Sequence, residues 1–241
     1  MVLIAVIAIS ACATTTGIKF RRAHVSRQVC QLGDTKILIQ REDYGPGKVY
    51  VHPHADETTA LEAARLIARS QGGQVVTLIH EKTRLISFHY HGKICQFDPN
   101  RIFTTKGVQE NLKLYGCDSL ETRAWVSHFA KQFKAAIPKG PVVAVHNNKQ
   151  YSMKYYLPHQ SLADDAAKIY MNPALYYRNF FLVTRERDFR LYKNKGFNVV
   201  LQSQHVRDDG SLSIVYAHQT YVNVEAGYDQ LFYQMRMLQN A

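Results

Sequence analysis

The chain has 241 residues, of which 46% are hydrophobic, and it carries a formal net charge of +11 from 30 Lys and Arg against 19 Asp and Glu. This length and apolar content suit one α/β domain with a substantial core, and no segment has the composition of a disordered tail. The positive charge favours acidic partners; because the cations are scattered and no RNA- or DNA-binding motif occurs, we expect a carboxylate-bearing substrate and no nucleic acid.

The N-terminus combines a short apolar run with a cysteine. Val2–Ile9 is shorter than the ~20 residues of a membrane-spanning helix, and small residues then precede Cys12. This order resembles a bacterial lipoprotein signal. We therefore expect an export or lipoprotein signal at residues 1–12, a periplasmic or cell-envelope location, and membrane anchoring through lipid on Cys12. No basic residue precedes Lys19, unlike in such signals, so either the true start lies upstream or this is a plain secretory signal. An apolar N-terminal strand is the structural alternative.

Three further cysteines matter here, because export permits disulfides. Cys30, Cys95 and Cys117 are odd in number, so at most one pair forms within the chain, and the sequence does not say which. Cys95 stands in a stretch of alternating apolar residues, and we expect it to be buried.

Beyond the N-terminus, we predict a basic lead-in over residues 13–30 and one folded domain over residues 31–241. Its first two strands are predicted at residues 35–41 and 48–54, on either side of the breaker-rich turn EDYGPG.

Strands and helices alternate along the rest of the domain. In chain order we predict a helix at 58–70, strands at 74–80 and 84–92, a helix at 119–136, strands at 141–148 and 180–184, a hairpin at 198–218 that turns at Asp209-Gly210, a strand at 220–226 and a helix at 227–239. Apolar residues at helical spacing indicate the helices, and continuous or alternating apolar runs indicate the strands. The pattern predicts a single α/β domain with a mixed, mostly central buried sheet flanked by helices.

Metal-binding and charged side chains stand at or near the ends of the predicted strands. His54 and Glu57 follow one strand, His146 lies near the end of another, and Glu225 lies in the last. Asn100-Arg101 follows a further strand, in FDPNRIFT. Ligand sites of open α/β sheets lie at strand ends, and a catalytic zinc site uses three protein ligands drawn from His and carboxylate side chains.

Each of these residues, taken alone, also has a structural explanation. Glu57 is an acid in the first turn of a helix, where the helix dipole favours it. His146 fits a hydrogen-bonded structural histidine, Arg101 a surface arginine after a turn, and Glu225 a solvent-facing strand acid. His52 shares a strand face with His54, so we expect it to be a packed structural histidine or to orient a metal ligand.

The ordered set of motifs is more specific than any one of them. VHPHADET, DPNRIFT, AVHNN and YVNVEA follow one another over about residues 51–226. In this order they resemble the zinc carboxypeptidase superfamily, and in spacing they are most similar to its succinylglutamate desuccinylase and aspartoacylase branch. The resemblance implies a zinc carboxypeptidase-like fold, so that the domain of residues 31–241 is expected to be zinc-hydrolase-like.

The same resemblance implies roles at the matching positions. His54, Glu57 and His146 would bind one Zn²⁺ per chain. Glu225 would be the general base that takes a proton from the attacking water and passes it to the leaving amine.

Substrate recognition is implied in the same way. Arg101, helped by Asn100, would bind the free carboxylate of the substrate through its planar guanidinium group. Family members also have an arginine that stabilises the oxyanion, for which Arg84 and Lys93 are the candidates, neither clearly in register.

These roles together predict an exported zinc-dependent metallohydrolase of the carboxypeptidase or amidohydrolase type. It would cleave an amide bond next to a free carboxylate, in cell-wall or other acidic peptides. An N-acyl amino acid deacylase fits the same site. The alternatives from other classes are a non-catalytic carboxylate-binding envelope protein on the same fold, and an envelope-interaction protein whose histidines are incidental.

Overall fold

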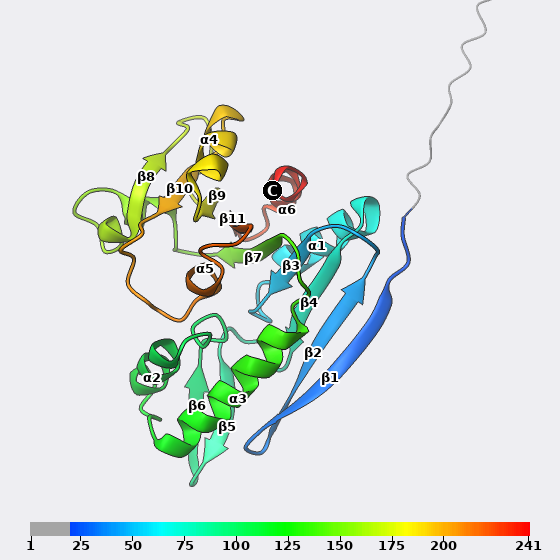
Figure 1. Cartoon of the computed structure of the whole chain (residues 1–241), viewed down its shortest axis with the longest axis vertical. Coiled ribbons are helices and arrows are strands. Elements are labelled where there is room, and N and C mark those ends of the chain that lie inside the picture. The colour runs from blue at the N-terminus through cyan, green and yellow to red at the C-terminus, as the bar shows by residue number, and fades with distance from the viewer. Residues whose placement is uncertain (1–19) are drawn as a thin grey trace, which may run out of the picture.

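The computed structural model describes residues 20–241, which form a single α/β domain around a nine-stranded mixed sheet (Figure 1). The predicted signal at residues 1–12 and its Cys12 lie outside the described residues. In the part of the chain from residue 20 onward, no helix is long and apolar enough to cross a membrane.

The strands of the large sheet are β1 (His24–Leu32), β2 (Thr35–Asp43), β3 (Val49–His52), β4 (Gln74–Ile79), β7 (Val142–Asn148), β8 (Ala166–Tyr170), β9 (Phe180–Val183), β10 (Val199–Gln202) and β11 (Tyr221–Gly227). A separate hairpin consists of β5 (Ile86–Tyr90) and β6 (Lys93–Phe97). The helices are α1 (Thr58–Gln71), α2 (Thr105–Leu114), α3 (Leu120–Ala136), α4 (Glu186–Asn194), α5 (Leu212–Val215) and α6 (Leu231–Asn240), with short 3₁₀ helices η1 (Met153–Tyr156) and η2 (Ala163–Asp165).

The strand order places the ends of sequence-distant strands side by side. The order is β1-β2-β4-β3-β7-β11-β9-β10-β8, in which β4, β3, β7 and β11 are parallel neighbours and both edges are antiparallel. In the register of β7 with β11, His146 lies directly opposite Glu225. The parallel core therefore brings the carboxyl ends of β3, β7 and β11 to one region of the sheet.

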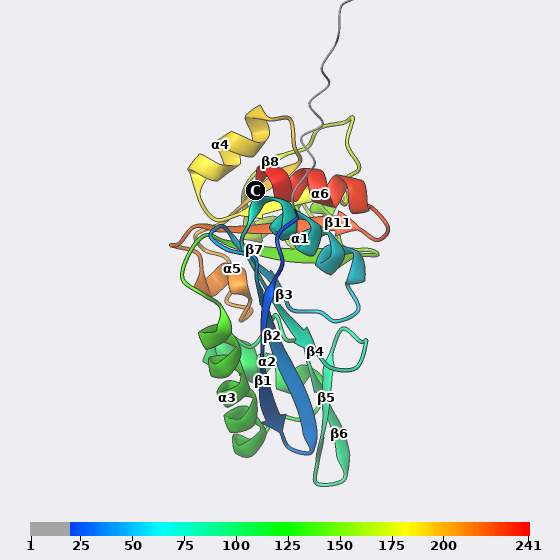
Figure 2. The same ribbon diagram turned by 90° about the vertical axis from the view of Figure 1, so that its right-hand side faces the viewer.

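The two faces of the sheet bury separate apolar cores. Val49 and Val51 of β3 belong to a core with α2, α3 and the β5–β6 hairpin, whereas Tyr50 between them belongs to a core with α1, α4 and α6. This follows from the alternation of side chains along a strand. Figures 1 and 2 show α2, α3 and the hairpin at one end of the molecule, and α1, α4 and α6 at the other.

Most of the predicted elements are confirmed, and with them the single-domain α/β class with a mixed central sheet. The helix predicted at 58–70 is α1, the helix at 119–136 is α3, and the terminal helix is α6. The Ser119 side chain caps α3 by accepting a hydrogen bond from the Thr122 amide at 3.1 Å, which explains the sharp start of that helix.

Two predictions are wrong. The basic lead-in of residues 13–30 includes most of β1, which pairs along its length with β2, so the domain does not begin at residue 31. Most of β1 is exposed, so its sequence lacks an apolar repeat. The hairpin at 198–218 does not form: β10 ends at Gln202 and pairs with β8 and β9, and α5 follows the Asp209-Gly210 turn.

A disulfide joins Cys95 of β6 to Cys117, between α2 and α3, and Cys30 is buried and free. Cys95 is buried, as predicted. The bond ties the hairpin to the helices that cover it.

Two glycines allow a close approach between α2 and the loop that follows β10. Gly210 has a φ of +76°, and a Cβ there would lie 2.7 Å from the Cα of Gly107. The Phe103 amide donates a hydrogen bond to the Gly210 carbonyl at 2.9 Å. This contact fixes the position of Asp209 relative to α2.

Candidate metal centre

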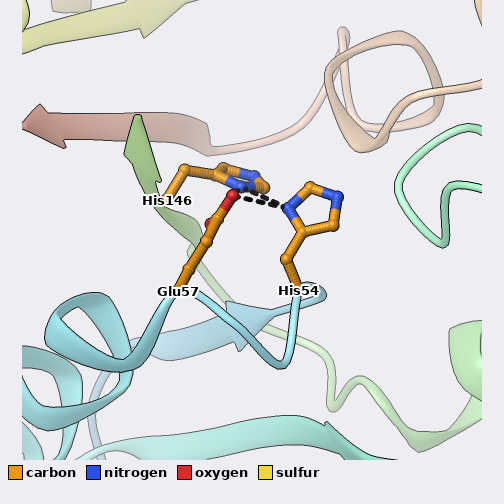
Figure 3. Close-up of side chains that lie close together, drawn as sticks. All are labelled: His54, Glu57 and His146. Carbon is orange, nitrogen blue, oxygen red and sulfur yellow. Dashed lines mark hydrogen bonds and ion pairs between the residues drawn. The ribbon is translucent and has the colours of Figure 1, made fainter. Parts of the chain in front are cut away.

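His54, Glu57 and His146 form a buried group whose donor atoms all lie within 4.8 Å of one another and could hold a metal ion. His54 follows β3, Glu57 is the residue before α1, and His146 belongs to β7, the neighbour of β3. Figure 3 shows the three side chains converging from these segments.

The donor atoms have the separation expected around one small cation. His54 Nδ1 lies 2.9 Å from Glu57 Oε1, and His146 Nδ1 lies 3.0 Å from Glu57 Oε2. The two Nδ1 atoms are 3.2 Å apart. Because Zn–N and Zn–O bonds are about 2.0–2.2 Å long, donors that share one tetrahedral zinc lie roughly 3.3 Å apart. Two imidazoles and a carboxylate are also a usual zinc donor set, so these residues fit zinc.

Asp98 orients His54 from the other side of the imidazole ring. Its Oδ1 lies 2.8 Å from His54 Nε2. Burial disfavours the charged form of His54, but the carboxylates of Glu57 and Asp98 outweigh it and raise the pKa of His54 to about 9. Asp98 was not singled out from the sequence; the signal was a carboxylate two residues before Asn100, directly after β6.

Glu57 is held in the ionised form by its surroundings. The Asn147 amide donates to Oε2 at 3.0 Å, and Arg84 donates to Oε1 at 2.7 Å. Burial would raise the pKa of Glu57, but the neighbouring His54 and His146 hold it well below its usual range.

His52 is a structural histidine that supports this group. Its ring nitrogens lie 2.9 Å from Thr77 Oγ1 and 2.9 Å from the carbonyl oxygen of Glu57. Burial lowers the pKa of His52 to about 4, so the neutral ring fixes the backbone of Glu57. Of the two roles expected for His52, the packed structural one fits these contacts, and through Glu57 it also positions a donor.

Glu225 lies beside the donor group, on the face of β11 that lines a cavity of about 560 Å³. Its Oε1 accepts a hydrogen bond from Asn223 at 3.2 Å, and its Oε2 accepts one from Asn148 at 3.1 Å. The side chain is buried, and burial raises the pKa of Glu225 against the lowering effect of His146. A carboxylate with a raised pKa is suited to accept and return a proton near neutral pH.

Arg84, Asn100 and Arg101 line the same cavity. Arg84 follows β4 and donates to Asp98 at 3.2 Å as well as to Glu57. Arg101 forms an ion pair with Asp209. Asn100 Oδ1 accepts a hydrogen bond from the Leu212 amide at 3.3 Å, so this side chain also anchors the start of α5.

The structure therefore brings six of the seven predicted site residues to the wall of one cavity, with the seventh, His54, buried directly behind Glu57 and His146. Lys93, the other oxyanion candidate, begins β6 and is exposed outside the cavity, so it does not fit that role. Sequence analysis also missed Asp209, and Tyr228, which donates a hydrogen bond to Asp56 at 3.2 Å.

No family model matches the chain, and no curated protein matches it.

Proposed function

We propose that the protein is a zinc-dependent hydrolase of the carboxypeptidase or amidohydrolase type, on a zinc carboxypeptidase-like fold. It cleaves an amide bond next to a free carboxylate, in acidic peptides such as those of the cell wall or in N-acyl amino acids. The observation that carries the proposal is the single cavity in which a buried two-histidine, one-glutamate group lies beside a second buried carboxylate and two arginines.

The metal-binding group and Glu225 have separate roles in this proposal. His54, Glu57 and His146 would hold zinc, which would supply Lewis-acid polarisation of the scissile carbonyl and lower the pKa of the attacking water. Glu225 accepts the proton of that water and returns it to the leaving nitrogen.

Two arginines bind the charges of the substrate. Arg84 donates a hydrogen bond to Glu57, and this position beside the donor group supports a role in stabilising the negative charge that develops on the carbonyl oxygen. Arg101, on the side of the cavity near Asp209, binds the free carboxylate of the substrate.

One observation favours this proposal over a carboxylate-binding module, and another supports the proposed compartment. A module that only binds carboxylates needs no buried glutamate beside a metal, whereas Glu225 is held there by two asparagines. The Cys95–Cys117 disulfide supports an oxidising compartment and so the export of the protein to the periplasm or cell envelope. Anchoring through lipid on Cys12 belongs to the same proposal.

The test measures both the zinc content of the protein and its turnover of substrates. Mass spectrometry of the purified protein is expected to give about one zinc per chain, which His146→Ala loses and His128→Ala, an exposed histidine of α3, retains. A panel of N-acyl amino acids and short peptides then distinguishes deacylase from peptidase activity. Glu225→Gln is expected to lower kcat by about 10²–10⁴-fold while zinc is kept. A protein that binds no zinc when zinc is offered contradicts the proposal.

A further inference from the structure

A second hollow, of about 330 Å³, adjoins the main cavity at the carboxyl ends of β7 and β11. Asn148, Lys149 and Tyr228 line both hollows. Asn148 stands at the junction, because its side-chain nitrogen donates to Glu225 at 3.1 Å and to the carbonyl oxygen of Arg178 at 3.2 Å. A ligand in the main cavity can therefore extend into the second hollow past Glu225.

Both charged side chains that line the second hollow are cationic. They are Lys149 and Arg178, and neither forms an ion pair with any acid of residues 20–241. Lys149 Nζ lies 5.0 Å from the centre of the Tyr228 ring, and Arg178 Cζ lies 5.8 Å from that of Tyr176. Aromatic faces orient a cation without neutralising it, so both charges stay available to an anion.

Arg178 also has a donor with no acceptor. Its Nε is buried and makes no hydrogen bond within the described part of the chain. A buried donor that is left unpaired costs about 1–3 kcal/mol, so most such groups in folded proteins have a partner. The donor therefore points to an acceptor from outside the described residues.

The hollow lies on the opposite side of Glu225 from Arg101. Tyr221, Glu225 and Gly227 share one face of β11 because side chains alternate along a strand. Helix α5 packs on β11 near its first residue, Tyr221. Asp209, the partner of Arg101, comes just before α5, so Arg101 lies toward the start of β11. Gly227, which lines the second hollow, is two residues past Glu225, roughly 7 Å along the strand.

We propose that Lys149 and Arg178 form a subsite for an acidic side chain on the amino side of the scissile amide. This inference rests on the proposed function, and it narrows the substrate class to peptides with two anionic groups. Arg101 binds the C-terminal carboxylate, and the Lys149–Arg178 subsite binds the carboxylate of an Asp or Glu residue before the cleaved bond.

The test compares two peptides that differ only in charge, N-acetyl-Glu-Ala and N-acetyl-Gln-Ala. Their binding to the full chain carrying Glu225→Gln is measured by calorimetry, and their turnover is measured with the unaltered chain. The glutamate peptide is expected to bind about tenfold more tightly, as for one charge-assisted hydrogen bond. Arg178→Gln with Lys149→Gln is expected to bring the ratio near one, and Lys131→Gln, an exposed lysine of α3, to leave it unchanged.

The outcomes separate this subsite from the hydrolase itself. Equal binding of the two peptides, or a ratio that survives the double substitution, overturns the subsite even if both peptides are cleaved. A charge-dependent ratio that the double substitution abolishes supports the subsite even if neither peptide is cleaved, in which case only the hydrolase proposal fails. Lys149→Gln alone, at an exposed side chain, provides a second variant with little risk to folding.

Discussion

Asp98 lies behind His54, with Oδ1 2.8 Å from Nε2, while the Nδ1 of the same ring faces Glu57 at 2.9 Å. The carboxylate accepts a hydrogen bond from Nε2–H and so leaves Nδ1 as the nitrogen that can bind a metal. Asp98 is itself fixed, because its backbone amide donates to Asn111 Oδ1 at 3.1 Å and its carboxylate accepts from Arg84.

Replacing Asp98 with asparagine is therefore expected to weaken metal binding. The loss should be about 10–100-fold in zinc affinity, as for other carboxylates that orient a histidine ligand. Competition with a chromogenic chelator measures it. The matched control is Asp34→Asn, which alters an exposed pair between Asp34, in the turn from β1 to β2, and His89 of β5. Equal zinc affinity in Asp98→Asn and the unaltered chain would contradict this role.

Asp209 is expected to compete with a substrate carboxylate for Arg101. One oxygen of Asp209 accepts a hydrogen bond from the Ser211 amide at 2.9 Å, and the other pairs with Arg101. Asp209→Asn keeps the first bond and removes the charge that competes with a substrate carboxylate. We expect KM for a carboxylate-bearing substrate to fall about 2–5-fold, the worth of an exposed ion pair, with little change in kcat. Asp164→Asn, at an exposed aspartate of η2, is the control; an unchanged KM in Asp209→Asn would exclude competition.

Glu42 joins β2 to α1, the helix that begins at the metal centre. Arg65 donates to its Oε1 and Oε2 at 2.9 and 3.1 Å, and Tyr44 donates at 2.8 Å. Burial would raise the pKa of Glu42, but Arg65 and Tyr44 outweigh it and leave the pKa below the ordinary 4.5. Glu42→Gln is expected to lower the free energy of unfolding at pH 7 by about 1–3 kcal/mol.

The pH dependence of this effect has a definite sign. Because the folded pKa is depressed, the stabilisation is fully present above the unfolded value of 4.5 and is lost as the pH falls through the lower folded value. Urea unfolding at pH 7 and at pH 3 should therefore show the difference between Glu42→Gln and the unaltered chain shrinking at pH 3. Glu62→Gln, an exposed acid of α1, should differ little at either pH. If the difference in unfolding free energy were the same at pH 7 and pH 3, the shape of the Glu42 side chain and not its charge would account for the stabilisation.

The Cys95–Cys117 disulfide closes a loop with a sequence separation of 22. Closing a loop of this length stabilises a protein by about 3 kcal/mol in the chain-entropy description. Reductant is expected to lower the urea midpoint of the unaltered chain and to leave Cys95→Ala/Cys117→Ala unaffected. Cys30→Ala should keep the sensitivity to reductant, because Cys30 is free. A midpoint in the unaltered chain that ignores reductant would contradict a stabilising disulfide.

The sequence predicted those parts of the molecule in which local pattern and tertiary packing agree. The helical repeat of apolar residues predicted α1, because that helix is buried along one face. The continuous apolar run Val142–Val145 predicted β7, because that strand is buried on both faces. The strand-end positions favoured a shared site, and the resemblance of the ordered motifs to the zinc carboxypeptidase superfamily implied that His54, Glu57 and His146 would be the ligands.

The remainder depended on contacts that no local pattern encodes. The polar strand β1 pairs along its length with β2. Where a strand was predicted, α5 begins at Leu212, whose amide donates to Asn100, more than a hundred residues earlier in the chain. The ion pair of Arg101 with Asp209 likewise joins residues that are remote in sequence. The sequence does not indicate such pairs, because their members become neighbours only in the folded chain.

The close contact of Gly107 with Gly210 depends on the absence of a side chain at both positions. Gly107 leads into the body of α2, and Gly210 follows the aspartate that faces Arg101. An alanine at either position would bring its Cβ to 2.3 or 2.7 Å from the Cα of the other glycine, so one of the two segments would have to move. Because Arg101 and Asp209, next to this contact, line the cavity, a substitution of one methyl group outside the cavity wall is expected to displace the Arg101–Asp209 pair.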